Sequence, residues 1–389
     1  MRIVPLVVAA LLLLPSAASA VEVAPLNDDF ADAIDLNAIG EGVFVDGVNV
    51  AATKETSEPN HAGNAGGHSV WYTWTAPPDD SVPHVAIQVF GQFDTLLGVY
   101  TGPTVDALTE VASNDDVGFG SSSVSFATTP GTVYRVAVDG FGGKTGRFSL
   151  FWNESPVNDN FAEAVVLAGA AGSRTGDTTQ GATIEPGEQD LFETGTSVWY
   201  SWTPPADGTY KISTFGSGMD TVMAIYEGSS LEALELLRFN DDDPDRGCCS
   251  SWIPLVDAQA STTYMIQIAA LDFVPGPLAL HWGPLIFGTN GVDTLVGTSG
   301  PEEIRGRAGN DIVRGGGGAD LLFGGRGNDN TAGGAGNDSL LDRSGTDTLL
   351  GNGGADTLDS RDAQRGDTLV GGPGADVCRG DPRDIRRAC

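Results

Sequence analysis

Basic residues are scarce in this chain, whose 389 residues include 20 Lys and Arg against 52 Asp and Glu. The formal net charge of -32 excludes the broad positive surface on which nucleic-acid binding depends. Cysteine occurs four times and never as Cys-x-x-Cys, so neither a dithiol redox centre nor a zinc knuckle is indicated. The four histidines form no His-Glu-x-x-His motif, and a Gly-x-Ser-x-Gly elbow and a dinucleotide-binding glycine motif are missing. These absences argue against the common enzyme classes.

Long apolar runs are confined to the N-terminus. Residues 1–20 contain a single charge at Arg2, an apolar run over 3–14 and the small residues Ala18-Ser19-Ala20. A membrane-spanning helix needs about 18 uninterrupted apolar residues, and prolines shorten this run, so we predict a cleaved secretion signal. The chain is therefore expected to be secreted to the extracellular space, with no membrane span.

Four cysteines in a secreted chain predict disulfides. Cys378 and the terminal Cys389 are expected to form a bond that ties the C-terminal tail, residues 380–389, to the last structural unit. Cys248 and Cys249 are adjacent, so they could form a strained vicinal disulfide, pair with the other two cysteines or remain as thiols. Of these alternatives we favour the vicinal bond.

An internal repeat of about 130 residues occupies most of the chain, and the motif Ser-Val-Trp-Tyr-x-Trp-Thr stands at both 69–75 and 197–203. Within each copy, apolar residues alternate with polar ones over short segments bounded by Gly, Pro, Asn and Asp, which is the pattern of half-buried antiparallel strands. The sequence therefore predicts two tandem antiparallel β-sandwich domains of the jelly-roll type, over 21–155 and 156–287.

A strict nine-residue period begins at Gly288. Eight consecutive units fill 288–359, and two more follow at 362–370 and 371–379 after an apparent two-residue insertion. Their sixth residue is acidic in every unit, and units that alternate along the chain form two sets. The first column contains Asp293, Asp311, Asp329, Asp347 and Asp367. The second column contains Glu302, Asp320, Asp338, Asp356 and Asp376.

This spacing has a physical interpretation. Six glycine-rich residues form a tight turn whose carbonyl oxygens converge, and the next three form a short strand with one inward apolar side chain. Two units complete one turn of a right-handed coil, so acidic residues eighteen positions apart are expected to stack. Stacked carboxylates repel each other unless a cation lies between them, and calcium accepts six or more oxygens in flexible geometry. The sequence predicts that both columns ligate several calcium ions.

These repeats resemble the repeat-in-toxin (RTX) family of calcium-binding nonapeptides over about a quarter of the chain. The resemblance implies a parallel β-roll over 288–379 that is disordered without calcium and folds when calcium arrives outside the cell. Three departures are expected to weaken individual units. Thr331 replaces the apolar strand residue, Asp342 replaces the leading glycine, and Cys378 occupies an apolar place.

The two sandwich copies resemble pre-peptidase C-terminal domains, the jelly-roll modules of secreted bacterial proteins. The resemblance depends on three motifs that both copies share, Asn-Asp-x-Phe-Ala, Ser-Val-Trp-Tyr-x-Trp and Asn-Asp-Asp. It implies an accessory module that assists binding, folding or secretion beside a hydrolase, although no catalytic neighbour is recognised here.

Acidic residues recur at one corner of each copy and could bind further calcium ions. Asn and Asp also cap turns through their own backbone, and we favour that interpretation slightly. The candidate ligands are Asp94, Asp115, Asp116, Asp220, Asp241 and Asp242. The paired tryptophans could form an exposed platform for carbohydrate, but strand alternation turns one of each pair into the core, so we favour core packing.

The sequence thus predicts an all-β, secreted, non-enzymatic calcium-binding protein with two β-sandwiches and a β-roll. The sandwich domains are expected to bind an extracellular ligand, which could be matrix, glycan or protein. The alternative is a secreted hydrolase, or an accessory subunit of one, with a pair of acids in a sandwich cleft.

Overall fold

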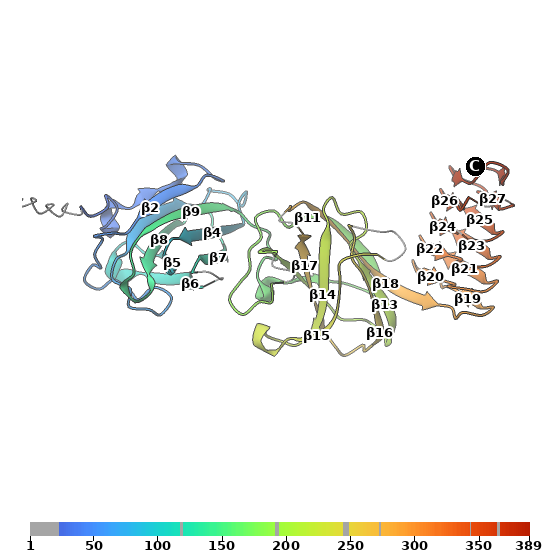
Figure 1. The fold of residues 1–389 in the computed structure, drawn as a ribbon, viewed down its shortest axis with the longest axis horizontal. Coiled ribbons are helices and arrows are strands. Elements are labelled where there is room, and N and C mark those ends of the chain that lie inside the picture. The colour runs from blue at the N-terminus through green and yellow to red at the C-terminus, as the bar shows by residue number, and fades with distance from the viewer. Residues whose placement is uncertain are drawn as a thin grey trace, which may run out of the picture.

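A computed structural model describes residues 23–116, 120–190, 194–243, 249–271, 274–342, 344–363 and 366–389. The fold of this part is all-β, as predicted. Two sandwich-like bodies and a C-terminal solenoid follow one another along the long axis of the molecule (Figure 1). The predicted secretion signal lies outside the described residues.

Helices in the described residues are single 3₁₀ turns. They are η1 (Phe30–Asp32), η2 (Leu36–Ala38), η3 (Val105–Ala107), η4 (Phe141–Gly143), η5 (Phe161–Glu163) and η7 (Leu231–Ala233). No helix in this part of the chain has the length and apolar character needed to cross a membrane.

The first sandwich has two facing sheets. One has the order β1 (Ile34–Asp35), β3 (Val70–Thr75), β8 (Val133–Gly140), β5 (Thr95–Thr101) and β6 (Thr109–Asn114). The other has the order β2 (Val45–Val48), β9 (Arg147–Glu154), β4 (His84–Gly91) and β7 (Ser122–Ala127). Apart from the short parallel strand β1, the eight strands pair in the order of a jelly roll.

The second sandwich repeats this topology strand for strand. Its first sheet has the order β10 (Val165–Leu167), β12 (Val198–Trp202), β17 (Tyr264–Ala270), β14 (Thr221–Glu227) and β15 (Glu235–Asn240). Its second sheet has the order β11 (Gly172–Thr178), β18 (Pro277–Phe287), β13 (Gly208–Ser213) and β16 (Trp252–Ala258). The internal repeat in the sequence is therefore a repeat of fold.

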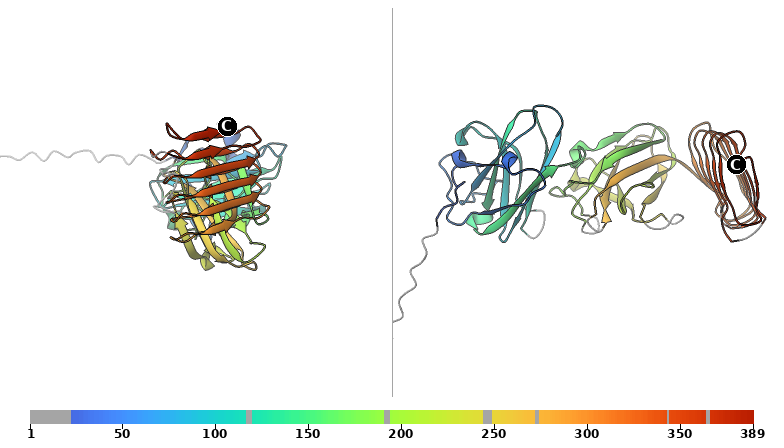
Figure 2. Two further views of the ribbon diagram at one scale, coloured as in Figure 1. Left: turned by 90° about the vertical axis from the view of Figure 1, so that its right-hand side faces the viewer. Right: turned by 90° about the horizontal axis from the view of Figure 1, so that it is seen from above.

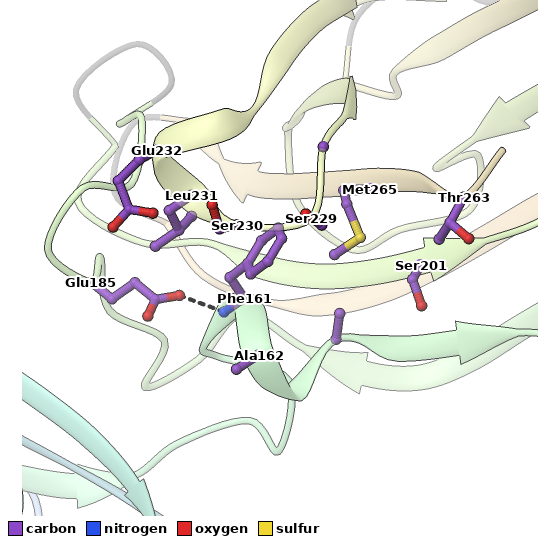
Figure 3. Close-up of a pocket in the computed structure, with 12 residues that line it drawn as sticks. Phe161, Ala162, Glu185, Ser201, Ser229, Ser230, Leu231, Glu232, Thr263 and Met265 are labelled. Carbon is purple, nitrogen blue, oxygen red and sulfur yellow. Dashed lines mark hydrogen bonds between the residues drawn. The ribbon is translucent and has the colours of Figure 1, made fainter.

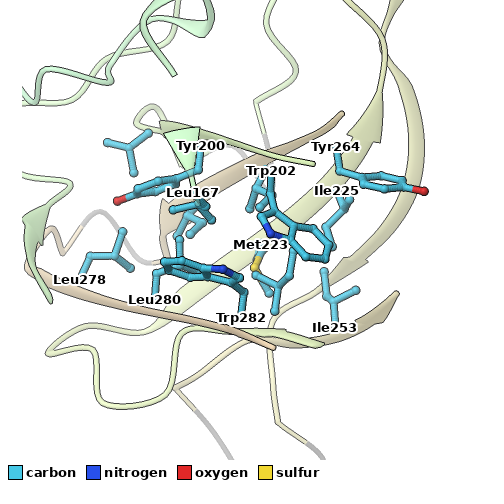
Figure 4. Close-up of a cluster of buried hydrophobic side chains, with 14 of the residues drawn as sticks. Leu167, Tyr200, Trp202, Met223, Ile225, Ile253, Tyr264, Leu278, Leu280 and Trp282 are labelled. Atoms are coloured by element: carbon cyan, nitrogen blue, oxygen red, sulfur yellow. The ribbon is translucent and has the colours of Figure 1, made fainter. Parts of the chain in front are cut away.

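Both tryptophans of each motif are buried, on opposite faces of one strand. Trp202 lies between the sheets of the second sandwich, where Tyr264 and Trp282 surround it (Figure 4). Trp199, three residues earlier, points to the other face and is covered by Phe161, whose ring centroid lies 5.2 Å away. Core packing, rather than an exposed aromatic platform, is thus the role of these side chains.

The solenoid contains two parallel sheets that face each other across a narrow core (Figure 2). One sheet contains β20 (Glu303–Arg305), β22 (Leu321–Phe323), β24 (Ser339–Leu341), β26 (Thr357–Asp359) and β28 (Val377–Arg379). The other contains β19 (Thr294–Val296), β21 (Ile312–Gly317), β23 (Asn330–Ala335), β25 (Thr348–Gly353), β27 (Thr368–Val370) and β29 (Ile385–Arg387).

The strand register of the solenoid follows the nine-residue period. Neighbouring strands pair residues eighteen apart, such as Leu322 with Leu340. The offset becomes twenty where Leu358 pairs with Cys378, because the inserted residues 360 and 361 are accommodated within that turn. Thr331 is buried in the core stack although it is not apolar. Strand β29 lies in the segment predicted as a C-terminal tail, and it pairs in parallel with β27.

One strand joins the second sandwich to the solenoid. The first part of β18 pairs with β11 and β13, and its last three residues, 285–287, pair in parallel with β20. The sandwich sheet therefore continues without a break into one sheet of the roll. The hydrogen bonds of a shared strand leave no room for a flexible linker at this boundary.

Buried charges reinforce this junction. Glu303 of β20 accepts a hydrogen bond from Lys211 of β13 at 2.6 Å and a second from Arg305. The Arg305 guanidinium lies 4.1 Å from the ring centroid of Trp252 and 4.0 Å from a carboxylate oxygen of Asp243. Burial lowers the pKa of Arg305 to about 10, so the side chain stays charged at neutral pH. No motif or periodicity in the sequence indicates this cluster.

Candidate metal centre

The acidic residues of the two columns stack as a continuous ladder. The backbone N–H of each member except the last of each column donates to Oδ1 of the aspartate one turn further along, over 2.7 to 2.9 Å. Asp311, for example, donates to Asp329, and Asp320 donates to Asp338. Each carboxylate is thereby fixed in orientation by the turn that precedes it.

The second oxygen of each carboxylate is buried and has no hydrogen-bond partner among the described residues. This applies to Oδ2 of eight aspartates, Asp311, Asp320, Asp329, Asp338, Asp347, Asp356, Asp367 and Asp376. Buried polar atoms in native proteins are nearly always paired, and an unpaired ionised carboxylate is costly. A row of such atoms therefore points to a cationic ligand.

Backbone carbonyls converge on the same places. A Cβ built on Gly315 would lie 2.3 Å from Oδ2 of Asp320 and 2.6 Å from the carbonyl oxygen of Gly333. Gly351 has the same surroundings, with Oδ2 of Asp356 at 2.3 Å. A leading glycine keeps this space open, because a side chain in its place would lie between these oxygens. Carboxylate and carbonyl oxygens are the donors that calcium prefers, so the residues present fit that ion.

The first member of each column differs from the rest. Thr289 donates from its backbone N–H and its hydroxyl to Oδ2 of Asp293. Thr298 binds Glu302 in the same way, from its N–H at 2.8 Å and from its hydroxyl at 2.5 Å. Protein donors thus satisfy these two carboxylates, and the columns of unpaired oxygens begin one turn later.

Burial and mutual repulsion raise the carboxylate pKa values within the ladder. For Asp320, burial is the largest cause and the carboxylates of Asp338 and Glu302 add to it, raising the pKa to about 6. For Asp347, burial and then Asp367 and Asp329 raise the pKa to about 6. Without a cation, the folded roll therefore holds carboxylates that resist ionisation.

The side chain of Asp342 is buried inside the roll, next to Asp329 and Asp347 of the first column. Burial, followed by repulsion from Asp347 and Asp329, raises its pKa to about 9. These three aspartates are the only group of three or more His, Cys, Asp or Glu in the described residues whose ligand atoms all lie within 4.8 Å of one another. The repeat pattern alone indicates only that Asp342 replaces a leading glycine.

The candidate acidic ligands of the two sandwiches are less closely grouped than the aspartates of the roll. In the first sandwich, Oδ2 of Asp94 lies 3.3 Å from Lys144 Nζ, and burial together with the charges of Asp94 and Asp115 raises the pKa of Asp116. In the second sandwich, Asp242 accepts a hydrogen bond from the Cys249 backbone. Neighbouring residues 117–119 and 244–248 lie outside the described part. Calcium binding by Asp94, Asp115, Asp116, Asp220, Asp241 and Asp242 stays a prediction.

A histidine and a glutamine occupy equivalent places in the two sandwiches. His61 bridges Glu58 and the Tyr100 hydroxyl, each at 2.8 Å, in a fully buried site of the first sandwich. In the second sandwich, Gln267 bridges Glu188 at 2.7 Å and the hydroxyl of Tyr226 at 2.8 Å. Since an amide performs the same bridging, the histidine is part of a structural hydrogen-bond network.

The C-terminal cysteines are joined. Cys378 of β28 and Cys389 form a disulfide across 11 residues, as the sequence predicted. The bond ties the end of the chain to the last turns of the roll. Cys248 lies outside the described residues, so the predicted vicinal bond with Cys249 cannot be placed.

A cavity of about 650 Å³ opens on the surface of the second sandwich (Figure 3). Its lining combines apolar Phe161, Leu231 and Met265 with hydroxyl groups and with the carboxylates of Glu185 and Glu232. In the first sandwich, the strand position of Met265 is occupied by an arginine, at residue 135, which covers the phenylalanine equivalent to Phe161 at 4.7 Å.

Comparison with known proteins assigns the solenoid. The family model described as RTX calcium-binding nonapeptide repeat matches four times, at residues 287–322, 296–331, 323–358 and 365–382. The C-terminal segment therefore consists of RTX repeats, a calcium-binding type typical of secreted proteins. Among curated proteins, no sequence matches the chain.

Solved structures resemble the chain only distantly. The CUB1-EGF-CUB2 domains of rat MASP-1 align with 9% identity and a TM-score of 0.17, over 64% of this chain and 99% of that one. The PBSX exported protein XepA aligns with 10% identity and a TM-score of 0.18, over 58% of this chain and 86% of that one. A protein from Burkholderia cenocepacia aligns with 9% identity and a TM-score of 0.19, over 63% and 83%.

Proposed function

We propose that this chain is a secreted calcium-binding protein whose β-roll folds when calcium enters the two columns. The observation that supports this most is the row of eight buried Oδ2 atoms without hydrogen-bond partners among the described residues, four of which lie beside a glycine carbonyl oxygen. Calcium between successive turns would satisfy these oxygens and remove the repulsion between stacked carboxylates.

Calcium binding can be measured on the full chain by competition with a chromophoric chelator. Several ions are expected to bind with dissociation constants of about 0.1 to 1 mM, the range of extracellular calcium modules. Magnesium at equal concentration is expected to compete weakly, because it demands a tight octahedron and keeps its water. Failure to bind calcium, or equal binding of magnesium, would contradict the proposal.

We further propose that the second sandwich binds an extracellular ligand in the cavity beside Met265. The hydroxyl and carboxylate groups of the wall suit a polar ligand such as a glycan or a peptide, and Phe161 and Leu231 supply an apolar floor. At the equivalent place of the first sandwich, Arg135 covers Phe30.

An array of glycans and matrix proteins, probed with the full chain in calcium, tests this binding role. We expect Met265→Arg, which copies the first sandwich, to reduce binding of any captured ligand at least ~10-fold by filling the cavity. The matched control, Arg135→Met, alters the other sandwich and should leave that ligand bound. Undiminished binding by the Met265→Arg variant would place the ligand elsewhere.

A further inference from the structure

Asp342 occupies a position that the repeat reserves for glycine. Its side chain is 2% exposed, and neither of its carboxylate oxygens has a hydrogen-bond partner among the described residues. Asp329 and Asp347, successive members of the first column, each have an unpartnered Oδ2. One ligand oxygen from each of the three lies within 4.8 Å of the other two. Four buried oxygens without partners thus meet at one level of the roll.

The turn before Asp342 leaves space for its carboxylate. A Cβ built on Gly324 would lie 1.9 Å from Oδ2 of Asp342 and 2.9 Å from Oδ2 of Asp329. The backbone of Asp342 remains in register, since its N–H donates to the carbonyl of Asp359 at 2.9 Å. Asp342 therefore extends the ladder by one inward carboxylate without disturbing the coil.

We propose that Asp329, Asp342 and Asp347 form a three-carboxylate calcium site that binds more tightly than the other sites of the roll. A glycine without a side chain stands in the place of Asp342 in eight of the other nine units, and the exception, Asp362, is only half-buried and accepts a hydrogen bond from the Gly345 N–H at 3.2 Å. The affinity of an oxygen site for calcium rises with the number of charged ligands. A dication here also removes the cost of three unpaired, mutually repelling carboxylates. This inference rests on the proposed calcium function of the roll.

Stepwise calcium binding to the full chain, measured by chelator competition, tests the site. The wild-type chain is expected to show one step tighter than the rest, and Asp342→Gly should weaken that step at least ~10-fold. Glycine is the residue of eight of the other nine repeats, so this variant keeps the fold. Asp342→Asn, which retains the shape and removes the charge, should weaken the same step. The control Asp338→Asn removes an ordinary ligand from the second column and should weaken later steps only.

The outcomes separate this inference from the function on which it rests. If Asp342→Gly binds its first calcium ion as tightly as wild type, or more tightly, the three-carboxylate site is wrong. In that case a loss of later steps in Asp338→Asn would leave the proposed function of the roll intact. If the wild-type chain binds no calcium, both proposals are wrong.

Discussion

Removal of calcium from the full chain is expected to unfold the β-roll and to leave both sandwiches folded. Each ion present at ten times its dissociation constant stabilises the folded state by about 1.4 kcal/mol. Four bound ions would therefore contribute about 6 kcal/mol, a large part of the stability of a domain. The core stack cannot replace this contribution, since most turns add only two buried aliphatic side chains.

Hydrogen exchange with and without a chelator measures the effect. Amides of β21 to β26 should lose protection by about 10⁴-fold, given that 1.4 kcal/mol corresponds to a factor of ten. Amides of β3 and β12, in the cores of the two sandwiches, serve as internal controls and should not change. Equal protection of the roll in calcium and in chelator would show that the ladder is not a working metal site.

Acid should partly substitute for calcium in the calcium-free protein. The pKa values of Asp320 and Asp347 are raised to about 6 in the folded roll, above about 3.9 in an unfolded chain. Folding therefore favours their protonated forms, and this stabilisation is complete below about pH 4 and lost as the pH rises through 6. Far-UV circular dichroism of chelated protein should show more β-structure at pH 5 than at pH 8, and an opposite trend would contradict it.

The Arg305→Ala variant is expected to loosen the junction between the second sandwich and the roll. Removing one partner of a buried ion pair typically costs about 3 to 5 kcal/mol, and we expect the lower part of this range because Glu303 keeps its hydrogen bond from Lys211. Here Glu303 and Asp243 would lose their contact with the guanidinium, and the Trp252 ring would lose the cation above it. Hydrogen exchange in β18 and β20 should accelerate by about 10² to 10³-fold in the presence of calcium.

An exposed arginine of the same roll provides the control. Arg314 stands on β21, away from the sandwich, and its replacement by alanine should change exchange by less than about 2-fold, as expected of surface substitutions. If Arg305→Ala and Arg314→Ala behave alike, the buried cluster does not hold the two bodies together.

The architecture could be predicted from the sequence because it depends on periodicity. Apolar and polar residues that alternate between turns predict half-buried strands. The motif at 69–75 returns at 197–203, which predicts two copies of one domain. The nine-residue period fixes which residues stack, because a coil of two units per turn places each residue above the one eighteen positions before it. The two-residue insertion at 360 and 361 is also visible in the sequence, because it interrupts the nine-residue period.

Four features depended on side-chain contacts that no periodicity of the sequence specifies, and only the tertiary structure decided them. Arg305 meets Trp252 and Asp243 because β18 is shared between two sheets. The side chain of Asp342 points inward because Gly324, eighteen residues away, leaves it space.

Two further features show the same dependence. The cavity of the second sandwich is open where its strand carries Met265 instead of an arginine. The first carboxylate of each column is paired because a threonine four residues before it lies within hydrogen-bond distance. Sequence determined the register along the chain, since backbone periodicity is local. Packing between the turns determined which carboxylates accept hydrogen bonds from the protein and which keep an oxygen for a ligand.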